Sequence, residues 1–157
     1  MSKIITKVKF QKEGGVEIHF DEKVGKTTKE VKFKCSELQS PDFDNAMSAL
    51  ERDVYHILEL PVDYAPQRMK ITGVSFSESE NTGVEGAVIT GQVELTTSNS
   101  PFCFNTPYLP FEQHSDTGTA PIMPEAAQRN LEALKTEALK YVEEGKRAQL
   151  DLLSVEA

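Results

Sequence analysis

The sequence predicts an α+β fold, in which an antiparallel sheet of about five strands packs against two helices in the order β-β-β-α-β-β-α. Three observations support this prediction. Apolar and polar residues alternate in five short segments, which is the two-residue period of half-buried strands. Two longer segments repeat apolar residues at the helical period and begin at a proline. A long proline-rich segment, residues 97–123, is expected to be a loop before the last helix.

The first third of the chain predicts a meander of three antiparallel strands. Alternating segments run over residues 4–10, 16–20 and 31–35. Gly14-Gly15 supplies the permissive backbone of a hairpin between the first two segments. Residues 21–29 are polar, and we expect them to form the connection to the third strand.

A helix is predicted from Ser40 until just before Pro61. Serine caps the first turn of a helix, Pro41 suits its first position, and Asp42 is favoured at its positive end. Apolar residues then recur at helical spacing as far as Leu58. Proline cannot continue the helix, so Pro61 marks its limit.

A second hairpin is predicted from residues 69–76 and 87–95, which brings the sheet to about five strands. Gly73 interrupts the alternation in the first of these segments. Ile71 and Val74 can therefore face the same side of the sheet only if a β-bulge lies between them.

The last helix is predicted to follow the long loop. Residues 97–123 contain four prolines and four aromatic residues. A loop of this length in a compact domain is usually functional or disordered. Pro124 then begins a segment with apolar residues on one helical stripe up to Val142, and we expect Gly145 to cap its end.

The length and composition fit one domain and a tail. A chain of 157 residues with 38% apolar residues can bury one sizeable core. We expect a single domain over residues 1–145 and a tail over residues 146–157. Cys35 and Cys103 are too few for a disulfide framework and lack zinc-ligand spacing, so the sequence predicts free thiols, no metal and no cofactor. The sequence shows no signal-like or membrane-spanning apolar stretch, which predicts a cytoplasmic protein.

The charge is distributed unevenly along the chain. A net charge of -8 disfavours generic binding to nucleic acid, although nine of the 17 basic residues fall within residues 1–34. Lys7 and Lys9 share one side of the first strand, and Lys32 and Lys34 share one side of the third. These lysines predict either a footprint for nucleic acid, such as single-stranded DNA, or for an acidic protein, or else a solvated face that suppresses edge aggregation. The absence of interleaved aromatic residues favours the second interpretation.

The tail carries the most specific motif of the chain, a run of five residues: Gln149, Leu150, Asp151, Leu152 and Leu153. This run resembles the short linear motif by which bacterial replication and repair proteins dock on the DNA sliding clamp. That motif family prefers Gln, Leu, Ser or Asp, Leu, and then Phe or Leu. All five positions of the run comply.

The physical logic of the motif does not depend on the family. The glutamine amide offers donors and an acceptor to a polar recess, and each leucine contributes about 0.8 kcal/mol per buried CH₂ group. A peptide near a chain end can extend into a groove without unfolding the domain. The alternative is that the leucines pack back onto the domain as a strand or a helical turn.

A second candidate site lies in the long loop, at Asn99, Phe102, Phe104, Asn105 and Tyr108. Aromatic rings beside asparagine amides are typical of a small-ligand or nucleotide-like pocket, or of a patch for an oligomer partner. The alternative is that the rings fasten the loop onto the sheet while asparagine and proline set its turns.

No catalytic motif is evident in the sequence. The three histidines, His19, His56 and His114, lack metal-ligand spacing, and no nucleophile elbow or glycine-rich phosphate loop accompanies them. We therefore predict a binding protein rather than an enzyme.

The chain as a whole resembles small uncharacterised proteins encoded by bacteriophages and prophages. The resemblance rests on the order of elements, the Gly-Val-Ser-Phe strand (residues 73–76), the Asn-Thr-Pro loop (105–107) and the Arg-Ala-Gln ending (147–149). It implies a setting in phage DNA metabolism or host takeover inside a bacterial cell, with no transferable activity. The leading hypothesis is an accessory protein that binds the host clamp, either recruiting its domain to DNA or competing with host clients. The alternatives are a ligand-sequestering anti-defence protein, with its pocket in residues 97–123, and a protein that binds single-stranded DNA.

Overall fold

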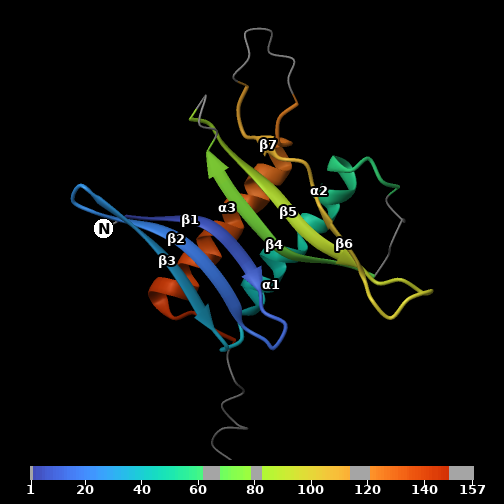
Figure 1. Cartoon of the computed structure of the whole chain (residues 1–157), viewed down its shortest axis with the longest axis horizontal. Helices are drawn as coiled ribbons and strands as arrows, with labels where there is room; N and C mark the ends of the chain where they lie inside the picture. The colour runs from blue at the N-terminus through green and yellow to red at the C-terminus, as the bar shows by residue number, and fades with distance from the viewer. Residues whose placement is uncertain (1, 62–67, 79–82, 114–120, 149–157) are drawn as a thin grey trace, which may run out of the picture.

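Seven strands form one antiparallel sheet in the computed structural model, which describes residues 2–61, 68–78, 83–113 and 121–148 (Figure 1). The strands are β1 (Ser2–Phe10), β2 (Val16–Val24), β3 (Thr27–Cys35), β4 (Met69–Glu78), β5 (Glu85–Val93), β6 (Phe102–Asn105) and β7 (Leu109–Pro110). Their order is β3-β2-β1-β4-β5-β6, and β7 pairs with β5. The predicted α+β class is confirmed, and the sheet gains two short strands from the predicted loop.

The N-terminal meander has the predicted order but a tighter second turn. Gly14 and Gly15 adopt the positive φ angles, 105° and 79°, that the first hairpin requires. Strands β2 and β3 pair as far as Val24 and Thr27, so the prediction of a polar connection over residues 21–29 is wrong. The polar residues there belong to strands that extend beyond the apolar core, where both faces carry polar side chains.

The predicted helix forms with an interruption. It consists of α1 (Pro41–Ser48) and α2 (Leu50–Ile57), with Ala49 between them in a helical conformation. The Ser40 hydroxyl accepts a hydrogen bond from the Phe43 amide at 3.4 Å, which confirms the predicted N-cap. Both helices end before Pro61, as predicted.

The second hairpin contains the predicted irregularity. The pairing of β4 with β5 shifts register between Ile71 and Gly73. Because of this bulge, Ile71 and Val74 both face the core, and each is only 2% exposed.

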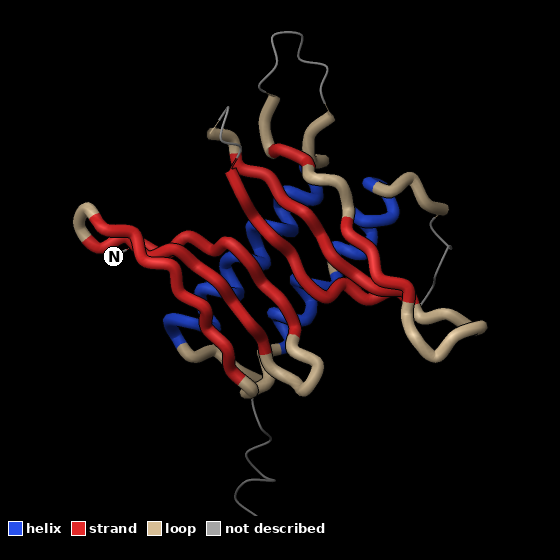
Figure 2. Tube along the Cα trace, viewed as in Figure 1, coloured by secondary structure: helices blue, strands red, loops and turns tan. Residues whose placement is uncertain are grey.

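The helices lie on one face of the sheet, and no described helix covers the other face (Figure 2). Helix α3 (Glu125–Leu139) continues into the π-helical turn η1 (Lys140–Glu144), and Gly145 ends it with φ 69°, as predicted. Core side chains come from the covered face of the sheet and the inner stripes of the helices, as with Ile18, Leu131 and Tyr141, which are fully buried. The uncovered face is therefore a candidate surface for function.

A short seam joins the two halves of the sheet. Strands β1 and β4 share three residue pairs, Lys7 with Ser75, Val8 with Val74, and Lys9 with Gly73. Register irregularities flank the seam, between Ile5 and Lys7 in β1 and at the β4 bulge. Beyond the seam the two strands splay apart (Figure 2).

Candidate functional site

The four predicted lysines lie on the uncovered face of the sheet, in two rows across β1, β2 and β3. The pairing registers give these rows as Lys9, Glu17 and Lys34, and then Lys7, His19 and Lys32. Each row therefore places a residue of β2 between two lysines. The net charge of this face therefore depends on Glu17 and His19 as well as on the lysines.

Glu17 forms an ion pair with one of the four lysines, Lys34. Its carboxylate accepts a hydrogen bond from His19 Nε2 at 2.6 Å and lies 3.6 Å from Lys34 Nζ. The hydrogen bond from His19, and then the charge of Lys34, lower the pKa of Glu17 and keep it ionised. Lys34 is thereby partly neutralised. Lys7 and Lys9 have no ion-pair partner within the described part of the chain.

Lys7 and Lys9 line a hollow of about 270 Å³ in the uncovered sheet face. The other lining residues come from β4, β5 and β6, and they are Thr72, Gly73, Val74, Ser75, Thr90 and Asn105. The hollow therefore unites members of two predicted sites, because Asn105 belongs to the predicted ligand loop. Lys32 and Lys34 lie outside it.

The other four loop residues do not join Asn105 in this hollow. The rings of Phe104 and Tyr108 lie against Gly91 and Gly86 of β5, so close that a Cβ atom on either glycine would come within 2.6 Å of a ring atom. Phe102 is 55% exposed, and Asn99 lines a separate hollow of about 360 Å³. Two of the predicted rings thus fasten the segment onto the sheet, which was the alternative interpretation of this loop.

The predicted docking residues, Gln149 to Leu153, lie outside the described residues. The three residues before them, Lys146 to Ala148, are held on the domain. We call these three residues the tail root. The predicted domain boundary at residue 145 therefore falls ahead of three residues that pack with the domain.

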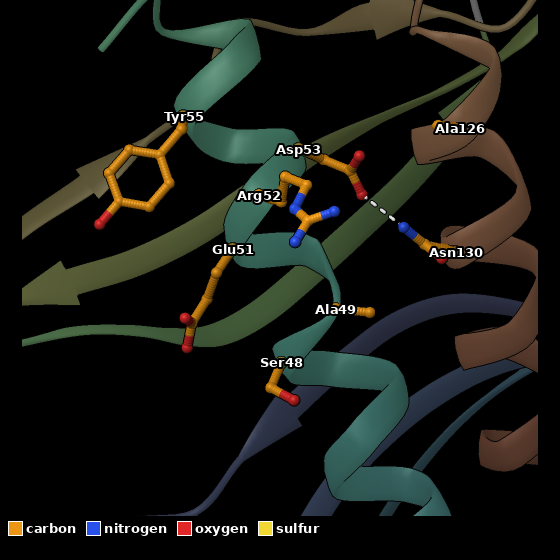
Figure 3. Close-up of a pocket in the computed structure, with 8 residues that line it drawn as sticks. All are labelled: Ser48, Ala49, Glu51, Arg52, Asp53, Tyr55, Ala126 and Asn130. Atoms are coloured by element: carbon orange, nitrogen blue, oxygen red, sulfur yellow. Dashed lines mark hydrogen bonds between the residues drawn. The ribbon is translucent and has the colours of Figure 1, made fainter. Parts of the chain in front are cut away.

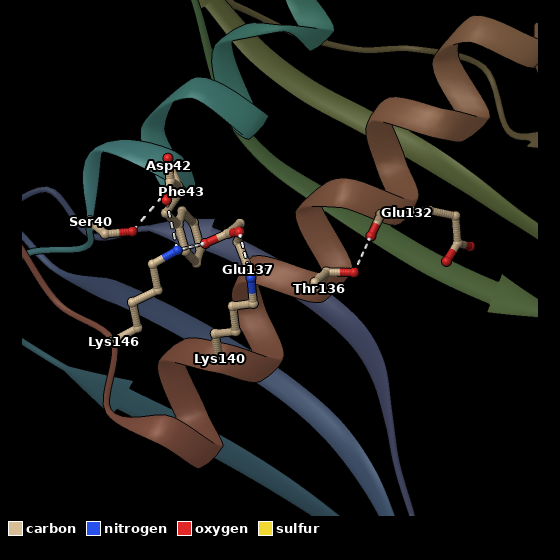
Figure 4. Close-up of polar contacts among 8 residues, drawn as sticks. All are labelled: Ser40, Asp42, Phe43, Glu132, Thr136, Glu137, Lys140 and Lys146. Atoms are coloured by element: carbon tan, nitrogen blue, oxygen red, sulfur yellow. Dashed lines mark hydrogen bonds and ion pairs between the residues drawn. The ribbon is translucent and has the colours of Figure 1, made fainter.

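The tail root is fixed at each of its positions. Lys146 Nζ lies 2.8 Å from Asp42 Oδ2 and 3.0 Å from Glu137 Oε1, so it bridges α1 and α3 (Figure 4). The guanidinium of Arg147 stacks on the ring of Tyr141, and the amide of Ala148 donates a hydrogen bond to the Leu38 carbonyl at 2.8 Å.

A thiol with altered acidity adjoins the tail root. The Tyr141 hydroxyl, then the Glu37 backbone, and also the nearby Arg147 guanidinium lower the pKa of Cys35. Arg147 Nη2 lies 4.0 Å from Cys35 Sγ. The sequence contains no signal for this cluster, because Cys35 and Arg147 are 112 residues apart and no local pattern connects them.

Another hollow, of about 800 Å³, lies between α2 and α3 (Figure 3). Within it Asn130 Nδ2 donates a hydrogen bond at 2.8 Å to Oδ2 of Asp53, which is 8% exposed. Burial raises the pKa of the neighbouring Glu51. Asp53 is held by Asn130 as a link between two helices. The described residues contain no cluster of histidine, cysteine and acidic side chains suited to a metal ion.

No family model matches this chain, and no curated protein or solved structure matches it either. Within the described residues, no helix has the length and apolar character needed to cross a membrane. The residues of the tail, the tail root and the uncovered sheet face are therefore the basis for a functional proposal.

Proposed function

We propose that this protein is a phage accessory protein of DNA metabolism or host takeover that binds the bacterial sliding clamp through Gln149, Leu150, Asp151, Leu152 and Leu153. The observation that carries the proposal is the match of all five residues to the clamp-docking motif. The match begins directly after Ala148, the last residue with a described contact to the domain.

The tail root supports this role because it gives the motif a fixed starting point. Lys146 holds the chain against α1 and α3, Arg147 holds it against η1, and Ala148 holds it against the segment before α1. The large side chains of the core next to the tail root are already buried, since Phe43 and Tyr141 are at most 1% exposed. We expect the leucines of the motif to be available to a groove on a partner.

The chemistry of the motif sets the strength of binding. Burial of three leucine side chains and the hydrogen bonds of one glutamine amide favour association, whereas ordering the peptide opposes it. We expect a dissociation constant in the micromolar range, which corresponds to about -8 kcal/mol.

The charge of the protein explains why a clamp would serve as its route to DNA. With a net charge of -8, the protein is repelled by the DNA backbone at long range. A peptide that recognises a ring already on DNA avoids this repulsion. The docked domain would then either act beside the DNA or exclude other proteins that use the same groove.

The decisive experiment is calorimetry of the full-length protein with a purified bacterial sliding clamp. A double variant, Gln149→Asp with Asp151→Gln, keeps the composition and charge of the tail but destroys the order of the motif. We expect it to lose binding. Leu95→Ala, at a 41% exposed leucine of the domain, serves as the matched control and should bind like the parent.

Two results would overturn the proposal. One is the absence of any heat of binding at clamp concentrations of about 100 micromolar, well above the expected dissociation constant. The other is equal binding by the parent and the double variant, because attraction between apolar tails in general would then explain the association.

A further inference from the structure

The hollow beside Lys7 and Lys9 owes its shape to the seam between β1 and β4. Gly73 sits opposite Lys9 with no side chain to fill the space, and a Cβ atom there would already meet the Val8 carbonyl oxygen at 3.0 Å. The β4 bulge next to Gly73 redirects the strand at this point. The result is a depression in the uncovered sheet face at the seam.

Side chains that carry hydrogen-bond donors line this depression. The Thr90 hydroxyl donates to Asn105 Oδ1 at 2.7 Å, which occupies the acceptor of the amide and leaves its Nδ2 group available. The Ser75 hydroxyl lies on the same lining. No carboxylate is among the lining residues, so the lining is rich in donors and free of anions.

Two ammonium groups add a local positive charge. Lys7 and Lys9 are two residues apart on one side of β1, which places their Cα atoms about 7 Å apart. Within the described residues neither ammonium group forms an ion pair, although Glu17 lies opposite Lys9 across β1 and β2; the carboxylate of Glu17 is paired instead with His19 and Lys34. A doubly charged anion bound between the two ammonium groups would balance both positive charges.

From this geometry we propose that the hollow binds one phosphate group, as the free ion or as the terminal monoester of a nucleotide. Its volume of about 270 Å³ lies just below the range of about 300 to 1,000 Å³ that is typical of sites for whole small molecules. It therefore suits a single anionic group, held by Lys7, Lys9, Ser75 and Asn105. The proposal is independent of clamp binding, because none of these residues belongs to the tail or its root.

The test is a titration of the full-length protein with inorganic phosphate, followed by NMR of the backbone amides. The ionic strength is held constant with chloride, so that general screening is the same at every point. We expect saturable shifts at residues of the seam. Lys7→Gln should weaken binding by about tenfold or more, because a charge-assisted hydrogen bond is lost.

Asn105→Asp is the sharper variant. The new carboxylate still accepts the Thr90 hydrogen bond and keeps the shape of the hollow, but it replaces a donor with a negative charge. We expect phosphate binding to disappear while the spectrum otherwise keeps its fold. Lys34→Gln is the matched control on the same sheet face, and it should bind phosphate as the parent does.

Two further ligands identify the source of the phosphate group. A nucleoside monophosphate that binds more tightly than inorganic phosphate, through the same amides, supports a nucleotide as the source. Equal affinity supports the free ion. If an oligonucleotide without a terminal phosphate binds there and phosphate does not, the proposal is overturned in favour of backbone binding. Equal phosphate affinity in the parent and Asn105→Asp would overturn it as well.

Discussion

The guanidinium of Arg147 lies 3.5 Å from the centre of the Tyr141 ring, and its Nη1 donates a hydrogen bond at 2.6 Å to the Tyr141 carbonyl oxygen. The same ring makes edge contacts with Phe33 and Phe43, at centroid distances of 6.0 Å. One fully buried tyrosine therefore connects the tail root to both β3 and α1.

Replacing Arg147 with lysine should destabilise the domain. Lysine keeps the charge but loses the planar group that stacks on the ring and bonds the carbonyl. We expect the free energy of unfolding in urea to fall by about 1 to 2 kcal/mol. Arg129→Lys, at an exposed arginine paired with Glu125 on α3, should change it by less than about 0.5 kcal/mol. Equal effects of the two substitutions would contradict the role assigned to the stack.

The acidity of Cys35 should depend on the Tyr141 hydroxyl. In a Cys103→Ser background, the pH midpoint of alkylation reports the thiolate of Cys35 alone. The Tyr141 hydroxyl donates its proton to the Glu37 carbonyl oxygen and is also the largest of the influences that lower the pKa of Cys35, so Tyr141→Phe should raise that pKa and move the midpoint to higher pH. Tyr108→Phe, which alters a tyrosine on the opposite half of the sheet, should leave the midpoint in place. An unchanged midpoint in Tyr141→Phe would rule out this cause.

The two aromatic residues of β6 should differ in their contribution to stability, with Phe104 contributing more than Phe102. Phe104→Ala removes a ring that packs against Gly91 and the core, and we expect it to cost about 2 kcal/mol or more in unfolding free energy. Phe102→Ala, two positions away at a ring that is 55% exposed, should cost less than about 0.5 kcal/mol. The reverse order, measured by denaturant unfolding, would show that the strand is placed differently.

The link between α2 and α3 should depend on Asn130. Asn130→Ala leaves the carboxylate of Asp53 without its described donor in a largely buried position, which should cost about 1 to 3 kcal/mol. The same substitution at Asn45, exposed on α1, should stay within about 0.5 kcal/mol of the parent. Thermal unfolding of the two variants side by side gives the comparison, and similar melting temperatures would refute the link.

Local signals explain what could be predicted from the sequence. The cap at Ser40, the bulge near Gly73 and the end of the last helix at Gly145 each depend on a few neighbouring residues. The strand β6 was missed because four residues are too few to show a period, and prolines surround them. Residues 102–105 form a strand because they pair with β5, and the local sequence does not indicate that pairing.

The candidate site was only half predictable for a related reason. The two-residue period of a strand places Lys7 and Lys9 on one side of the sheet. The presence of Asn105 beside them requires the neighbour order β1-β4-β5-β6, which joins segments about a hundred residues apart. A single sequence contains no local signal for that order.

The short seam between β1 and β4 also has a consequence for how the chain acquires its structure. The meander of β1 to β3 and the hairpin of β4 and β5 each contain mostly near-neighbour contacts, which form early because their loops are short. Only three residue pairs join them directly, and α3, which contacts β1 and, through Lys135, both β4 and β5, is the last described α-helix to be synthesised. We therefore expect the meander and the hairpin to form first in the growing chain and to associate only after α3 has been synthesised. The contacts of Lys7 and Lys9 with β4, including the pair of Lys9 with Gly73, should then be among the last to form.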